Sequence, residues 1–146
     1  MPQLEVATIV MKDAVNVLIA KAADGPDKDK WVIPSDFIRE FERTIDACSR
    51  SMKEKTGLSV VPKQVLFLSE IVEPPTDRRA VFCFAECASS GDPTPDASYS
   101  ECLFVDPRDL GKYQKEGMSD LTADAFFKFS KILQAQASAM PRGGNV

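Results

Sequence analysis

The residues best suited to metal or phosphate chemistry lie in one short segment, RSMKEKTG, at residues 50–57. Ser51 precedes Glu54 by three positions and Lys55 by four, so a helix would place the three side chains on one face. Three carboxylates on such a face would suit Mg²⁺, a hard cation that binds oxygen ligands. Here a single carboxylate is accompanied by a hydroxyl and by an ammonium group, which offers only donors and repels a cation. The spacing suits a magnesium site, whereas the residue types suit it poorly.

The chain contains no histidine, which narrows the chemistry further. Ser-His-Asp and Cys-His catalysis are excluded, and so is every histidine metal site. Acid–base chemistry must use carboxylates, lysine, tyrosine, cysteine or bound water. The cysteines have no C-x-x-C spacing, and we expect reduced, mostly buried thiols at Cys48, Cys83, Cys87 and Cys102.

Composition is typical of a globular domain, with 44% hydrophobic and 27% charged residues in 146. The formal net charge of −4 argues against a broad nucleic-acid surface. No apolar run approaches the roughly 18 residues of a membrane span, and the N-terminus lacks a secretory signal pattern. We therefore expect a cytoplasmic protein without a membrane partner. A single domain is predicted over residues 1–140, followed by a flexible tail at 141–146.

The elements that must position residues 50–57 are predicted from hydrophobic patterning. Strands are predicted at residues 4–12, 15–22, 31–35, 60–72, 80–88 and 101–107. Polar segments rich in proline and serine predict loops at 73–79 and 89–98. The order of strands, helix, strands and helix predicts a mixed sheet packed between helices.

Helices are predicted at residues 44–56 and 119–137. The first has an apolar stripe, with Thr44 as its N-terminal cap and Gly57 as its left-handed C-terminal residue. The stripe consists of Ile45, Cys48 and Met52. The second helix has a core-packing stripe and begins at a cap formed by either Ser119 or Thr122. Its stripe consists of Phe126, Phe129 and Leu133.

Together, the element order and a motif between Asp36 and Leu58 resemble the Nudix (MutT-like) family. That family has the signature G-x5-E-x7-R-E-U-x-E-E-x-G-U, in which U is bulky and apolar. Without a gap, the matching positions are Glu42, Arg50, Met52, Glu54, Gly57 and Leu58. The positions that differ are Asp36, Ser51 and Lys55. Outside the motif, Trp31, Pro34 and the segment ECLFVDPRDL are also similar to the family pattern.

The resemblance implies a Nudix-like α/β/α sandwich, in which the mixed β-sheet is flanked by helices. It implies a cleft for a nucleotide-like small molecule, with Mg²⁺ or Mn²⁺ as cofactor in active members. By position, the catalytic candidates are Glu54, Arg50 and Glu42. The ligand-binding candidates are Lys55, Ser51, Glu101 and Trp31, and the metal-ligand candidates are Glu54 and Glu101. A homodimer is expected by analogy only.

The departures favour a degenerate member of the family, because the face of residues 51, 54 and 55 changes in formal charge from −3 to 0. Lys55 would then hold a diphosphate directly as a point charge, with hydrolysis lost or strongly reduced and no cofactor required. One alternative is an active pyrophosphohydrolase with a rearranged metal site that recruits Glu42, Glu54, Glu101 and Asp46. The other alternative is a protein-interaction scaffold on the same fold.

Several of these residues also have ordinary structural interpretations. Arg50 is interpreted mainly as an ion-pair partner of Glu54 or Glu42 that orients the loop. Trp31 is more typical of a core or rim aromatic than of a base-stacking platform. Arg78 and Arg79 are interpreted as a solvated hairpin tip rather than as phosphate ligands.

Overall fold

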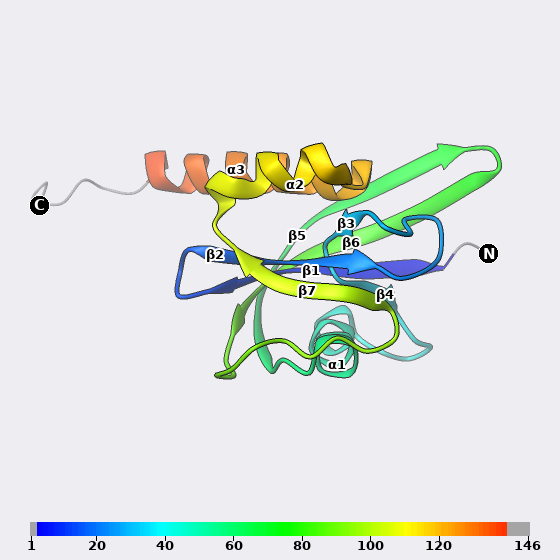
Figure 1. The fold of residues 1–146 in the computed structure, drawn as a ribbon, viewed down its shortest axis with the longest axis horizontal. Helices are drawn as coiled ribbons and strands as arrows, with labels where there is room; N and C mark the ends of the chain where they lie inside the picture. Colours follow the sequence, from blue (N-terminus) through cyan, green and yellow to red (C-terminus); the bar gives the residue numbers. More distant parts are fainter. Residues whose placement is uncertain (1–2, 140–146) are drawn as a thin grey trace, which may run out of the picture.

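The structure is a computed structural model that describes residues 3–139. Along the chain, the elements are β1 (Leu4–Lys12), β2 (Asn16–Ala22), β3 (Trp31–Val32), β4 (Ser35–Phe37), α1 (Thr44–Thr56), β5 (Val60–Glu73), β6 (Thr76–Cys87), β7 (Tyr99–Val105), a 3-10 turn (Pro107–Asp109), α2 (Leu110–Gly117) and α3 (Asp120–Ala139). Figure 1 shows α1 on one face of the sheet and α2 and α3 on the other. The predicted mixed sheet between helices is confirmed.

The sheet follows the order β3-β2-β1-β6-β5, with β4 paired to β1 and β7 paired to β2. β1 and β6 run parallel, whereas the other pairings are antiparallel. β1 pairs with β2 only at Met11↔Val17 and Lys12↔Asn16. Nearer the N-terminal end of β1, residues Glu5 to Ala7 pair instead with β4. The sheet therefore opens between β1 and β2, and this opening creates the cleft described below.

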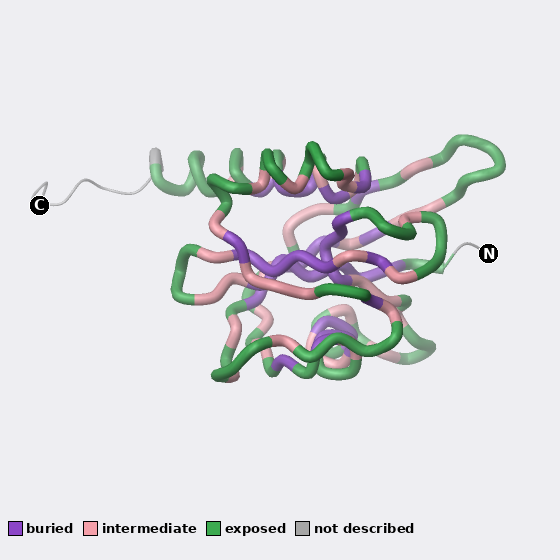
Figure 2. The backbone as a smooth tube through the Cα atoms, in the orientation of Figure 1, coloured by how far each residue is buried: buried purple, intermediate pink, exposed green. Residues whose placement is uncertain are grey.

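β1 is buried on both faces, which explains its nearly continuous apolar sequence. Alternate residues of a strand point to opposite faces. Ile9 packs in the core cluster that contains Phe126 and Phe129 of α3. The neighbouring Val10 packs with Met52 of α1. Figure 2 shows this buried layer along the central strands, between the two helical layers.

The helix predictions hold in extent, with corrections at the ends. Gly57 ends α1 at φ 72°, the left-handed value expected of a C-terminal glycine. Thr44 is not the N-terminal cap, because Arg43 holds that position and the helix lacks a side-chain cap. Ile45 is 49% exposed and lies outside the core stripe. The apolar stripe of α1 instead starts one residue before Cys48, at the buried Ala47.

In α3, the Thr122 backbone N–H donates to Ser119 Oγ at 3.2 Å, so Ser119 is the N-terminal cap. Phe126 and Phe129 are buried as predicted, but Leu133 is 41% exposed. Figure 2 shows the last turns of α3 largely exposed. None of the helices within residues 3–139 is long and apolar enough to span a membrane. The predicted tail at 141–146 lies outside the described residues.

The largest correction concerns residues 73–79, which were predicted as a loop. β5 continues to Glu73 and β6 starts at Thr76, so only two prolines join the strands. Arg79 pairs across the ladder with Glu70, and their side chains form an ion pair at 2.8 Å. Arg78 and Arg79 therefore belong to a strand, and the interpretation of a solvated hairpin tip is wrong for Arg78, which is partly buried. The short elements β4 and α2 were also not predicted.

Candidate functional site

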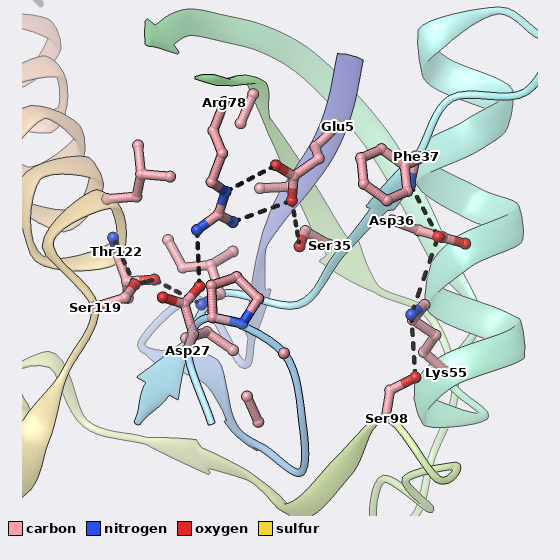
Figure 3. Close-up of a pocket in the computed structure, with 18 of the residues that line it drawn as sticks. Glu5, Asp27, Ser35, Asp36, Phe37, Lys55, Arg78, Ser98, Ser119 and Thr122 are labelled. Carbon is pink, nitrogen blue, oxygen red and sulfur yellow. Dashed lines mark hydrogen bonds and ion pairs between the residues drawn. The ribbon is translucent and has the colours of Figure 1, made fainter. Parts of the chain in front are cut away.

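A cleft with a volume of about 680 Å³ lies where β1 and β2 diverge. Its walls come from β1, β4, β6, the connection between β2 and β3, the end of α1 and the start of α3. The apolar lining consists mainly of Ala7, Val32, Ile33, Ala80 and Phe82. Figure 3 shows charged side chains gathered at two separate places, one around Lys55 and one around Arg78.

Lys55 lines the cleft and is held by groups from two segments, β4 and the start of β7. Its Nζ donates to Ser98 Oγ at 3.1 Å and lies 4.0 Å from Asp36 Oδ1. The same Nζ lies 5.8 Å from the centre of the Tyr99 ring. A partly buried ammonium held in this way keeps a fixed position with only partial charge compensation, and it provides a local positive centre in the cleft.

Ser51 is buried, and its Oγ donates to the carbonyl oxygen of Cys48 at 3.2 Å, one turn earlier in α1. The hydroxyl therefore bonds within its own helix rather than lining the cleft. This local bond is common for serine in helices.

Arg50 lies at the centre of a group that we call the Arg50 cluster, formed with Asp36, Glu42 and Glu54. Its Nε and Nη2 contact the two oxygens of Glu42 at 2.6 and 2.9 Å, a bidentate pair. Its Nη1 lies 2.9 Å from Asp36 Oδ2 and 3.2 Å from Glu54 Oε2. The carboxylates of the motif are thus engaged by a guanidinium group, as the structural interpretation of Arg50 expected.

Glu54 has a second arginine partner, Arg39, whose Nη2 lies 3.2 Å from Oε2. The Glu54 side chain is 46% exposed at the edge of α1 and does not line the cleft. Glu101 lies on β7, where its side chain is 57% exposed and pairs with Lys21 at 3.9 Å. The structure does not bring Glu101 together with Glu54.

The donor set on this face of α1 does not fit a divalent cation. Ser51 directs its oxygen into its own helix, and Lys55 places an ammonium where an oxygen ligand is needed. Across residues 3–139, no three histidine, cysteine, aspartate or glutamate side chains are grouped as metal binding requires.

Trp31 is buried on the α2 side of the sheet, away from the cleft lining. Its Nε1 donates to Glu116 Oε2 at 2.9 Å, and its ring meets the Tyr113 ring edge-on at 5.1 Å between centroids. Both partners belong to α2. The tryptophan therefore anchors α2 to the sheet, in agreement with the interpretation as a core aromatic.

Sequence reasoning missed a second charged group in the cleft, formed by Arg78, Glu5 and Asp27, which we call the Arg78 cluster. Arg78 Nε and Nη2 each lie 3.2 Å from a Glu5 oxygen, and Nη1 lies 3.0 Å from Asp27 Oδ2. A signal was present in the sequence. Arg78 lies two residues before Ala80 and four before Phe82, so a strand places all three on one face.

The free energy of unfolding should depend on pH through the Glu42 carboxyl group. Its pKa is lowered from 4.5 to about 2, mainly by the side-chain hydrogen bonds from Arg50, although burial acts in the opposite direction. A lowered carboxyl pKa stabilises the fold above the unfolded-state value, and this stabilisation is lost as the pH falls from about 4.5 toward 2. We expect Glu42→Gln to reduce the free energy of unfolding at pH 7 by about 1–2 kcal/mol, since solvent screening weakens the pair, and to have little effect near pH 2.

Urea unfolding at a series of pH values measures this effect, with the exposed neighbour Glu40→Gln as the matched control. A Glu42→Gln deficit of equal size at every pH would contradict the assignment, because it would show that the carboxyl does not titrate with folding.

A sequence model of the NUDIX domain matches residues 1–125. A search of curated proteins found no match.

Solved structures share the fold at low sequence identity. The chain is similar to a MutT NUDIX hydrolase from Burkholderia pseudomallei, with a TM-score of 0.75, 17% identity, and coverage of 88% of this chain and 98% of that one. It is similar to the NUDIX domain of Shewanella oneidensis NrtR complexed with ADP ribose, with a TM-score of 0.75, 17% identity, and coverage of 91% and 89%. It is also similar to a C. elegans Ap4A hydrolase, with a TM-score of 0.72, 13% identity, and coverage of 91% and 98%.

The family match covers most of the chain, and the predicted α/β sandwich agrees with these solved folds. The chain therefore belongs to the NUDIX family.

Proposed function

We propose that this protein binds a nucleoside-diphosphate-type ligand in its cleft through Lys55, with metal-dependent hydrolysis lost or strongly reduced. The observation that carries the proposal is the position of Lys55. It occupies the second glutamate position of the family signature, and its ammonium group lines the cleft. A cation held there can contact a diphosphate directly, as a point charge.

The size of the cleft and the similar structures support a nucleotide ligand. About 680 Å³ lies within the range of typical small-molecule sites. Among the similar structures, one NUDIX domain is complexed with ADP ribose and another protein is named as an Ap4A hydrolase. The apolar lining provides a surface for a base or ribose beside the charged positions.

The reduced hydrolysis follows from the residues that surround Lys55. A divalent cation about 4 Å from the ammonium would meet a repulsion of about 8 kcal/mol at an effective dielectric constant of 20. Ser51 is bonded within its helix, and Glu54 is held between Arg39 and Arg50. In this proposal, Glu42, Arg50 and Glu54 stabilise the loop before α1 rather than carry out catalysis.

A second candidate is an active pyrophosphohydrolase that uses Mg²⁺ or Mn²⁺. The exposure of Glu54 favours it, because a half-exposed carboxylate can exchange its arginine partners for a metal carried in by the substrate. Release of the nucleoside monophosphate from a panel of nucleoside diphosphate derivatives, abolished by Glu54→Gln, would support this candidate. The homodimer and the cytoplasmic location remain predictions.

The binding proposal predicts the effect of removing the Lys55 ammonium group. We expect Lys55→Ala to weaken ADP-ribose binding in EDTA by about tenfold, because a charge-assisted contact with the diphosphate is lost. Lys53→Ala is the matched control, since Lys53 is an exposed lysine of the same helix outside the cleft lining. Isothermal titration calorimetry measures both. Equal affinities for the two variants, or no binding to the unmutated protein at millimolar ADP-ribose, would contradict the proposal.

A further inference from the structure

The Arg78 cluster connects the two walls of the cleft. Arg78 comes from β6, whereas Asp27 comes from the connection between β2 and β3. Their contact of 3.0 Å between Nη1 and Oδ2 joins segments that are 51 residues apart. Figure 3 shows this contact separated from the Lys55 group by the body of the cleft. The cleft therefore holds a second cationic side chain, Arg78, apart from Lys55, although Glu5 and Asp27 give the Arg78 cluster a formal charge of −1.

Glu5 and Asp27 hold Arg78 in different ways. Glu5 lies in β1, contacts both Nε and Nη2, and also accepts from Ser35 Oγ at 3.5 Å. Its residue is buried, and its backbone pairs with Phe37 of β4. This bidentate contact fixes the plane of the guanidinium. Glu5 is therefore a positioning residue for Arg78.

Asp27, in contrast, contacts Arg78 through one oxygen from an irregular segment. The neighbouring residues 24–26 and 28–30 are exposed, and Lys28 N–H donates to the Gly25 carbonyl in a turn. Backbone hydrogen bonds hold the segment itself, since Asp29 N–H donates to the Ala22 carbonyl and Lys30 N–H to the Asp27 carbonyl, both at 2.9 Å. Release of Arg78 therefore needs only a rotation of the Asp27 side chain, which is 20% exposed, and not an opening of the segment. Asp27 can leave Arg78 without disturbing the β1–β6 ladder, and the Nη1 that it occupies would then face the cleft.

We propose that Arg78 forms a second anion subsite, which Asp27 occupies when ligand is absent and which a phosphate group of the ligand takes over. The inference rests on the proposed function, because it adds a second phosphate contact to the same cleft. It defines the ligand class more narrowly, as a nucleotide that carries a phosphomonoester in addition to its diphosphate.

Charge explains why a phosphomonoester would displace Asp27. At neutral pH it carries a charge of about −1.5 to −2, against −1 for a carboxylate, and its oxygens match the guanidinium fork. The N-terminal turn of α3 contributes in the same direction. Ser119, Leu121 and Thr122 line the cleft at the start of this 20-residue helix, where the helix dipole favours negative charge.

NAD⁺ and NADP⁺ test the subsite, because they share one diphosphate and differ by a single phosphomonoester. The preference, measured by calorimetry in EDTA, is the ratio of the dissociation constants for NAD⁺ and NADP⁺. We expect the unmutated protein to prefer NADP⁺. Asp27→Asn should increase this preference by about tenfold, because the competing carboxylate is removed. The matched control is Asp24→Asn, an exposed aspartate of the same connection that also lines the cleft.

Arg78→Lys keeps the positive charge but loses the planar guanidinium group that contacts two phosphate oxygens at once. The ratio of the NAD⁺ and NADP⁺ dissociation constants should therefore fall toward a value of one. If NAD⁺ binds through Lys55 but the preference is equal in the unmutated protein, Asp27→Asn and Asp24→Asn, the inference is overturned and the proposed function stands. If neither nucleotide binds, the proposed function is overturned. The subsite is then tested by titrating inorganic phosphate into the Asp27→Asn and Asp24→Asn variants. Tighter phosphate binding by Asp27→Asn than by Asp24→Asn would uphold the subsite, and equal binding would overturn it.

Discussion

A protein that carries both Ser51→Glu and Lys55→Glu is expected to gain metal-dependent hydrolysis. We expect its rate of hydrolysis of ADP-ribose to AMP and ribose 5-phosphate with Mg²⁺ or Mn²⁺ to exceed that of the unmutated protein on the order of a thousandfold, since a bound metal contributes several kcal/mol of charge stabilisation. The physical reason is electrostatic. The two substitutions replace an inward-bonded hydroxyl and an ammonium group by carboxylates beside Glu54.

The control for this gain is a variant with the same change in net charge, in which the second glutamate lies on a different face of α1. Ser51→Glu combined with Lys53→Glu meets this condition, because Lys53 is exposed and lies outside the cleft lining. Circular dichroism establishes that both variants fold, which matters because Ser51 is buried. A folded Ser51→Glu, Lys55→Glu protein that is no faster than either the control or the unmutated protein would show that residues 51 and 55 do not limit hydrolysis.

Removing the Arg50 guanidinium is expected to have the largest effect on stability. Arg50→Met should lower the free energy of unfolding by about 3–5 kcal/mol, the usual cost of breaking a largely buried ion pair by deleting one partner. The reason is that Asp36, Glu42 and Glu54 would then lie close together without their shared cation. Because domains of this size have only about 5–15 kcal/mol of stability, the loss is a large fraction of the total.

Urea unfolding at neutral pH measures the loss, and Arg39→Met provides the comparison. Arg39 also pairs with Glu54, but its side chain is mostly exposed, so its removal should cost less than about 1 kcal/mol. Similar losses of unfolding free energy for the two variants would contradict a special structural role for Arg50. The Arg50 cluster would then stabilise the fold no more than an exposed ion pair does.

The central strands of the fold were predictable because their hydrophobic patterns directly reflect how deeply the residues are buried. β1 and β2 are apolar along almost their whole length, as expected of strands covered on both faces. Gly57 was found for a similar reason, since few residues adopt the left-handed conformation that ends α1. The hairpin at residues 73–79 was missed because two prolines and several charges resemble a loop, whereas cross-strand pairs such as Glu70 with Arg79 stabilise it as a ladder.

The candidate site was predictable only in part. Helical spacing placed Ser51, Glu54 and Lys55 near one another, but only the three-dimensional contacts show that the Ser51 hydroxyl bonds within α1. The Arg78 cluster as a whole could not be predicted from the sequence. Glu5 and Arg78 are 73 residues apart and belong to strands whose parallel pairing is set by the whole sheet. Contacts of this kind depend on topology, which single-sequence patterns do not contain.

The central claim is that the face of α1 at residues 51, 54 and 55 no longer holds a divalent cation and presents Lys55 to the ligand instead. Titration of Mn²⁺ into the unmutated protein, followed by the electron paramagnetic resonance signal of free Mn²⁺, tests this claim most directly. We predict a signal that rises in proportion to total Mn²⁺ up to millimolar concentration, and saturable binding in the Ser51→Glu, Lys55→Glu protein. Saturable micromolar binding by the unmutated protein that disappears in Glu54→Gln would contradict the claim.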